Sequence, residues 1–164
     1  MATLLDLERT GAVSRIDPEL NPRIQELRLI YTSPGVQQWI EQVLPTLEST
    51  WKVEESPIEQ LTALIEIFCA GDTLSFGWQF NPLRPHRNGV WELKTADLRM
   101  FGWFSAKDCF VVAAADMADR IKDHGLYAGY VGQVVRFRDG LDLDEPKFIS
   151  GDDPHAVVSD FSYP

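Results

Sequence analysis

The stretch that decides the fold is GVWELKTADLRMFGWFSAKDCFVVA, residues 89–113. Apolar and polar side chains alternate along 89–94 and again along 98–104, and a third apolar run follows at 109–113. Alternation with a period of two is typical of β-strands, and short breaks at 95–96 and 107–108 leave room only for tight turns. The stretch therefore predicts three consecutive antiparallel strands, a β-meander.

A two-residue turn at 95–96 sets the predicted register of the first hairpin. The cross-strand pairs would then be Lys94 with Asp97, Leu93 with Leu98 and Glu92 with Arg99. The last pair is an ion pair worth about 0.2–1 kcal/mol. Alternation also sorts the side chains onto two faces. The apolar face, expected to pack on helices, carries Trp91, Leu93, Leu98 and Met100. The opposite face carries Glu92, Lys94, Arg99, Phe101 and Trp103.

Upstream of the meander, residues 25–32 alternate like a strand and lead into two predicted helices. Ser33 before Pro34 is a helix-entry signal, and apolar residues at helical spacing follow as far as Pro45. Ser56 and Glu59 stand in the spacing of a capping box, with an apolar stripe behind them that ends near Gly71. The two helices predict a hairpin that covers one face of the sheet.

The two ends of the chain have weaker patterns. Residues 1–24 are expected to form an arm or a short helix, and residues 116–138 a helix interrupted at its glycines. Residues 139–164 contain three prolines and many aspartates, which favours an irregular acidic tail. We therefore predict an α+β fold with an arm at 1–24, a main domain at 25–138 and a tail at 139–164.

Composition bounds the class of protein. The 164 residues are 45% hydrophobic, enough for the core of one domain. No run approaches the roughly 18 apolar residues of a membrane span, and the first residues lack a signal-peptide pattern, so we expect a cytoplasmic protein with no membrane partner. Cys69 and Cys109 lie in apolar runs and are expected to be buried free thiols.

Charge is distributed unevenly along the chain. The formal net charge is −10, but residues 1–82 carry −7, residues 83–138 carry +3 and residues 139–164 carry −6. The field of the whole molecule should repel a phosphate backbone. Only a local site in the middle segment could favour RNA.

Three segments resemble the RelE/ParE/HigB toxin superfamily, especially its phage-associated HigB-like branch. They are residues 27–31 leading into 36–40, residues 76–83, and residues 89–94 followed by 97–104. The segment 89–94 with 97–104 is the most specific of the three. Members of the family typically have the sequence Gly, an apolar residue, an aromatic residue and then Glu-Leu-Arg, followed by a strand that contains an Arg. The resemblance covers about residues 25–115; beyond it, the basic Lys-Lys stretch usual in the family is absent.

The resemblance implies a RelE-like fold, with an N-terminal strand and a helical hairpin packed on the meander, and a helical or irregular C-terminal extension. It also implies a toxin with an antitoxin protein as partner, which cleaves mRNA on the ribosome without a metal or other cofactor. Attack by a 2′-hydroxyl needs a base, a cation for the phosphorane and a proton for the leaving oxygen. By resemblance, Arg99 would stabilise charge, Lys94 would bind phosphate, and His124 or Tyr127 would transfer protons. Substrate binding would fall to Arg120, Lys122, Phe101 and Trp103.

Other interpretations remain open. Each of these residues also has a structural interpretation, such as an ion pair for Arg99 or core packing for Phe101 and Trp103. A non-enzymatic phage or mobile-element protein is the main alternative, whose acidic residues would engage a basic nucleic-acid-binding partner. Those residues are Asp142, Asp144, Glu145, Asp152, Asp153 and Asp160. A gyrase poison like the ParE branch is a third possibility that no residue separates from the first.

Overall fold

The computed structural model describes every residue from 1 to 164. In chain order its elements are α1 (Leu4–Thr10), β1 (Ser14–Arg15), β2 (Leu29–Thr32), α2 (Pro34–Gln42), η1 (Leu44–Thr46), α3 (Pro57–Cys69), β3 (Leu74–Ser75), β4 (Phe80–Pro82), η2 (His86–Asn88), β5 (Trp91–Lys94), β6 (Leu98–Ala106), β7 (Cys109–Met117), α4 (Ala118–His124), α5 (Tyr127–Gly140), α6 (Pro154–Val157) and β8 (Phe161–Ser162).

A mixed six-stranded sheet lies at the centre, in the order β1-β2-β7-β6-β5-β4. The predicted meander is confirmed, because β5, β6 and β7 pair antiparallel in sequence. β2 joins the sheet parallel to β7, while β1 and β4 extend its two edges in antiparallel pairing. The α+β class is therefore confirmed.

Both predicted helix starts are confirmed. The Ser33 hydroxyl accepts from the Val36 amide at the start of α2. Ser56 and Glu59 form the capping box of α3, and Pro57 occupies its first turn. Local side-chain bonds of this kind satisfy amides that have no partner inside the helix, so they can be predicted from sequence alone.

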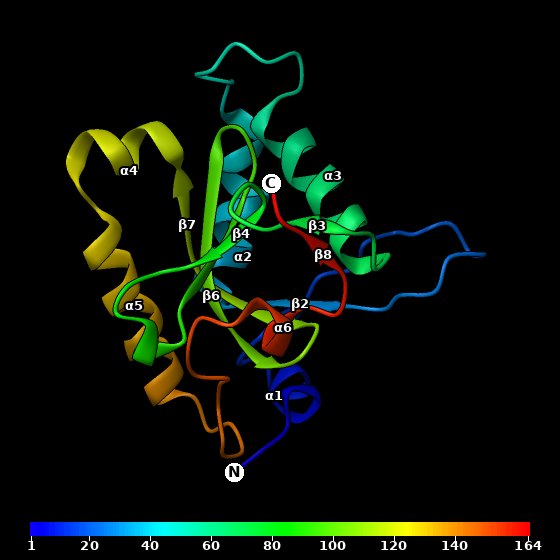
Figure 1. Cartoon of the computed structure of the whole chain (residues 1–164), viewed down its shortest axis with the longest axis vertical. Coiled ribbons are helices and arrows are strands. Elements are labelled where there is room, and N and C mark those ends of the chain that lie inside the picture. The colour runs from blue at the N-terminus through cyan, green and yellow to red at the C-terminus, as the bar shows by residue number, and fades with distance from the viewer.

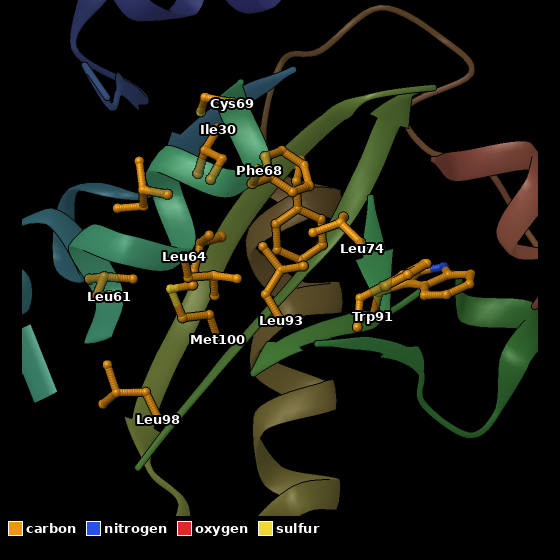
Figure 2. Close-up of a cluster of buried hydrophobic side chains, with 14 of the residues drawn as sticks. Ile30, Leu61, Leu64, Phe68, Cys69, Leu74, Trp91, Leu93, Leu98 and Met100 are labelled. Carbon is orange, nitrogen blue, oxygen red and sulfur yellow. The ribbon is translucent and has the colours of Figure 1, made fainter. Parts of the chain in front are cut away.

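Helices cover both faces of the sheet (Figure 1). α2 and α3 lie on one face and bury the apolar side chains predicted for it, with Trp91, Leu93, Leu98 and Met100 in the larger core cluster (Figure 2). α5 lies on the other face, where Val131 and Val134 join Phe101 and Trp103 in a second cluster. The assignment of side chains to faces is thus confirmed, but the second face is covered by a helix.

The predicted register of the β5–β6 hairpin is wrong. Lys94 lies opposite Arg99 and Glu92 lies opposite Phe101, so the turn has four residues, 95–98, instead of two. The Thr95 amide donates to the Leu98 carbonyl and closes this turn. The predicted register differs from the observed one by two residues. Because side chains alternate with a period of two, each side chain stays on the face predicted for it. The predicted Glu92–Arg99 cross-strand pair is therefore replaced by Lys94 opposite Arg99.

The ends of the chain pack against this sheet. Leu7 of α1 is buried in the second cluster, and the Ala2 amide donates to the Asp142 carbonyl at 2.9 Å. In the segment after α5, Val157 and Val158 are buried, and β8 pairs parallel with β3. Residues 1–24 and 139–164 are therefore integral parts of the packed structure.

Arg28 ties the C-terminal segment to the rest of the molecule. Its completely buried guanidinium donates to the carbonyls of Phe68, Asp72 and Asp160 and to the Asp108 carboxylate. Both cysteines are free, with Cys69 buried and Cys109 half-buried. No helix has the length and apolarity required to cross a membrane.

Candidate active site

The β5–β6 turn is held by one buried carboxylate. Asp97 is completely buried and accepts from the Thr50 amide and hydroxyl, each at 3.0 Å, and from the Gln60 side-chain amide at 2.6 Å. In return the Asp97 amide donates to the Gln60 carbonyl oxygen at 3.0 Å. The loop before α3, the helix itself and the turn are thereby joined at one point. These hydrogen bonds fix the backbone of the turn and therefore the positions of Lys94 and Arg99, the two cations that flank it.

Those cations are Lys94 and Arg99, which lie directly opposite each other across the hairpin. Nη1 of Arg99 donates to the carbonyls of Thr95 and Leu98, at 2.7 and 2.8 Å. The Lys94 ammonium donates to the Gly77 carbonyl in the loop before β4. Both side chains are half-buried, so each keeps a part of its charged group available to a ligand.

A buried polar cluster stands behind the two cations. Glu92 is only 4% exposed, and Asn81 of β4 lies opposite it. Oε2 of Glu92, Oδ1 of Asn81 and Nε of Arg99 are all buried without a hydrogen-bond partner in the protein. An unpaired buried polar atom costs about 1–3 kcal/mol, so each one calls for a partner such as a water molecule, an ion or a ligand. Three of them in one place mark this cluster as a candidate site.

The ionisable groups of the cluster have shifted pKa values. Burial raises the pKa of Glu92, and hydrogen bonding by Asn81 and the charges of Lys94 and Arg99 offset only part of that rise. Burial lowers the pKa of Lys94, and the positive charge of Arg99 lowers it further against the opposing effect of Glu92. Ionisable groups whose pKa values are shifted by burial and by charged neighbours are common in sites that move protons.

Tyr127 completes the cluster from the first turn of α5. Burial raises the pKa of its phenol, with the negative charge of Glu92 adding to the effect, so the hydroxyl keeps its proton at neutral pH. The ring packs edge-on against Phe101, with centroids 5.7 Å apart. The structure thus brings together Arg99, Lys94 and Tyr127, which the sequence also singled out, and adds Glu92.

An open cavity of about 660 Å³ lies beside Lys94 and Arg99. Its lining includes Ala63, Leu64 and Ile67 of α3 and, from the loop before β4, Trp78. Trp78 is 70% exposed. Sequence reasoning missed it because residues 71–88 have no periodic pattern, although an aromatic residue beside a glycine in a loop was the available signal.

The surface role expected for Phe101 and Trp103 is incompatible with the structure. Both are completely buried beneath α5; Phe101 stacks on Tyr130 with centroids 5.3 Å apart, and the Trp103 indole donates to the Lys147 carbonyl. Neither ring can stack on a base. Strand alternation placed them correctly on the second face, but it could not show that a helix covers that face.

The remaining candidates, Arg120, Lys122 and His124, do not line the cavity beside Lys94 and Arg99. The Arg120 guanidinium donates to the Asp116 carboxylate at 2.9 Å, in a cluster with Tyr130. The Lys122 ammonium lies 5.6 Å from the centre of the Trp51 ring. His124 is exposed at the end of α4. Of these three, only Lys122 contributes to the electrostatics of the cluster, where it helps lower the pKa of Lys94.

The acidic residues of the C-terminal segment lie at separate places in the structure. Asp142, Asp144 and Glu145 are exposed after α5, and Asp142 lies 3.6 Å from the N-terminal amine. Asp152 pairs with His86 at 2.9 Å, and Asp153 caps α6. Asp160 accepts from the Thr73 hydroxyl. The side chains of Asp152, Asp153 and Asp160 therefore already contact other groups of this chain, and Asp142 lies near the N-terminal amine.

No group of three or more His, Cys, Asp or Glu side chains is arranged to hold a metal ion. Comparison of the chain with protein-family models, with curated proteins and with solved structures found no match. The chemistry of the site must therefore be argued from its own residues. Two cations beside a cavity, with a protonated phenol and a buried carboxylate behind them, can bind a phosphate and move protons at it.

Proposed function

We propose that the chain is a RelE/HigB-like toxin that cleaves mRNA through its own side chains, with an antitoxin protein as partner. The observation that carries the proposal is the position of Lys94 and Arg99, opposite each other at the cavity and next to Tyr127 and Glu92. The order of strand, helical hairpin and meander is the order on which the resemblance to this superfamily rests.

The proposed reaction is attack of a 2′-hydroxyl on the adjacent phosphorus, with loss of the 5′-oxygen of the next nucleotide. Arg99 binds the phosphate and stabilises the charge that develops on its oxygens. Lys94, whose pKa is lowered by burial, supplies a neutral amine more readily than an exposed lysine and takes the 2′-hydroxyl proton. Tyr127, which is protonated at neutral pH, gives its proton to the leaving oxygen. Glu92 interacts with both cations through its negative charge.

The net charge of the molecule affects its long-range attraction for an RNA substrate. A net charge of −10 gives no long-range attraction for free RNA. The ribosome is itself polyanionic, so it does not remove this repulsion. Binding of the substrate must therefore rest on the local cations Lys94 and Arg99.

The test is induction of the protein in growing bacteria, for the wild type and Arg99→Ala. We expect growth arrest and cleaved transcripts for the wild type and relief of both in Arg99→Ala, because the charge that stabilises the phosphorane is lost. Arg136→Ala is the matched control, since Arg136 is exposed on α5 away from the cavity. Circular dichroism of each purified variant checks folding, and Tyr127→Phe provides a second variant that keeps the ring and its packing.

Two outcomes would contradict the proposal. Unimpeded growth with intact transcripts, from soluble and folded wild type, would exclude a toxin of this kind. Arrest with intact transcripts and broken DNA would favour the gyrase-directed alternative.

A non-enzymatic binding protein is the second candidate. The exposed run of Asp142, Asp144 and Glu145 favours it, because adjacent carboxylates can engage a basic partner. Reversal of two of these charges, at Asp144 and Glu145, separates the two candidates.

A further inference from the structure

Trp78 stands out among the exposed side chains because its backbone is held firmly. The Trp78 amide donates to the Ser75 carbonyl at 3.2 Å, and the Gly77 amide donates to the Phe80 carbonyl at 2.8 Å. The Gln79 side chain accepts from the Ser75 amide, which closes the same turn. The Trp78 ring is 70% exposed on this fixed turn, and it lines the same cavity as Lys94 and Arg99.

The turn is also joined directly to the candidate active site. The Lys94 amide donates to the Gln79 carbonyl at 2.8 Å, and the Lys94 ammonium donates to the Gly77 carbonyl. Gly77 has φ of +87°, a left-handed conformation that glycine adopts without strain. The backbone of the turn is therefore fixed against β5 by the hydrogen bond from the Lys94 amide, and the Lys94 ammonium adds a second contact to the same turn.

The cavity offers two kinds of surface to one ligand. Trp78 and the apolar residues of α3, Ala63 and Ile67, suit a flat aromatic group, while Lys94 and Arg99 suit an anion. A nucleotide combines both, and indole rings beside cations are a recurring way to hold single-stranded nucleic acid. Double-stranded nucleic acid does not fit, because its bases are stacked on one another and present no free face.

We propose that Trp78 is the stacking platform for one unpaired base of the RNA substrate, whose phosphate lies on Lys94 and Arg99. The inference rests on the proposed function and assigns base binding to Trp78 in place of the buried Phe101 and Trp103. Because every base has an aromatic face, Trp78 contributes affinity with little preference for sequence.

The experiment measures binding without cleavage. The probe is a fluorescently labelled single-stranded hexanucleotide with 2′-O-methyl groups throughout, which lacks the attacking hydroxyl. Its dissociation constant is measured by anisotropy at several low salt concentrations, with purified full-length protein. Loss of one base–aromatic stack corresponds to about a tenfold or greater weakening for Trp78→Ala, and Trp78→Phe should recover most of it.

Two further variants make the result specific. Trp51→Ala is the matched control, because Trp51 is also exposed, at 55%, but does not line the cavity. Arg99→Ala removes the cation that stays charged throughout the proposed reaction and should reduce the dependence of binding on salt by about one phosphate contact, whereas Trp78→Ala should weaken binding without changing that dependence.

The outcomes separate this inference from the proposed function. Unchanged affinity in Trp78→Ala, an equal loss in Trp51→Ala, or no binding by the wild type would each overturn the role of Trp78. Trp78-dependent binding by a protein that leaves cellular transcripts intact would support the subsite and count against the nuclease.

Discussion

The Asp97 carboxylate is completely buried and accepts four hydrogen bonds, from the Thr50 amide and hydroxyl, the Trp51 amide and the Gln60 side chain. Burial pushes the pKa of Asp97 up, but hydrogen bonds from Ser49, Gln60 and Thr50 together outweigh burial and leave the pKa below its ordinary value of 3.8. A lowered pKa in the folded state means that the charged carboxylate stabilises the fold. This contribution is fully present above the unfolded pKa and is lost as the pH falls through the folded one.

Asp97→Asn is expected to lower the free energy of unfolding by about 2–3 kcal/mol at neutral pH, because an amide is a weaker acceptor and brings a donor toward the Gln60 amide. Urea denaturation at neutral pH measures this loss. The same measurement is repeated at pH values down to about 3. As the pH falls, the free energy of unfolding should decrease less in the variant than in the wild type.

Asp144→Asn is the control for Asp97→Asn, since Asp144 is exposed. If the free energy of unfolding fell equally with pH in Asp97→Asn and in the wild type, the charged Asp97 carboxylate would not be the source of this stabilisation.

At the scale of elements, the long β6–β7 pairing contains an irregularity at Gly102. The register shifts between Phe101 and Gly102, and a Cβ on Gly102 would lie 1.9 Å from the Val111 carbonyl oxygen. A β-bulge of this kind increases strand twist locally. The close approach of the neighbouring strand therefore requires that Gly102 has no side chain, and the isolated glycine inside a strand pattern was the available signal.

Gly102→Ala is expected to destabilise the protein by about 3 kcal/mol, because backbone of β7 must move to admit a methyl group. Gly129→Ala is the matched substitution in α5, where a Cβ meets nothing within 4 Å. It should be neutral or stabilise by up to about 1 kcal/mol, since alanine favours a helix over glycine. Thermal or urea unfolding compares the two, and similar effects of both would contradict the close contact between β6 and β7.

At the scale of the whole molecule, the acidic flanks and the cationic site belong to one packed structure. The segment after α5 is tied to the rest of the molecule through Arg28 and through β8, which pairs with β3 in a separate two-stranded sheet, so its carboxylates are held on the surface. Their field acts on any ligand of the molecule, and it opposes the approach of RNA to Lys94 and Arg99.

The double variant Asp144→Lys, Glu145→Lys tests which of the two candidate functions this surface serves. If the protein is a nuclease, growth arrest and transcript cleavage should be retained or increased, because repulsion of RNA is reduced. If the acidic surface binds a basic partner, capture of that partner in a pull-down should be lost.

Glu48→Lys with Glu66→Lys is the matched control, since it changes the charge equally at other exposed positions. Loss of transcript cleavage in the first double variant alone would count against the nuclease and for the binding protein.

The outcome at the candidate site shows the limits of sequence reasoning. Lys94, Arg99 and Tyr127 were predicted, and the structure places them together. Glu92 was predicted to form a surface ion pair, but β4 and α5 bury it. Phe101 and Trp103 are covered by α5, and Trp78 takes the exposed position. Each of these differences depends on an element distant in sequence.

The sequence by itself determined the features that depend on near neighbours. These are the helix starts at Ser33 and Ser56, the meander, and the division of its side chains between two faces, because capping and strand alternation act over a few residues. Only the tertiary structure decided the turn length at 95–98, the parallel pairing of β2 with β7, and the burial of the second face. The physical reason is that pairing and burial are set by packing between segments far apart in the chain, where several arrangements satisfy the same local pattern.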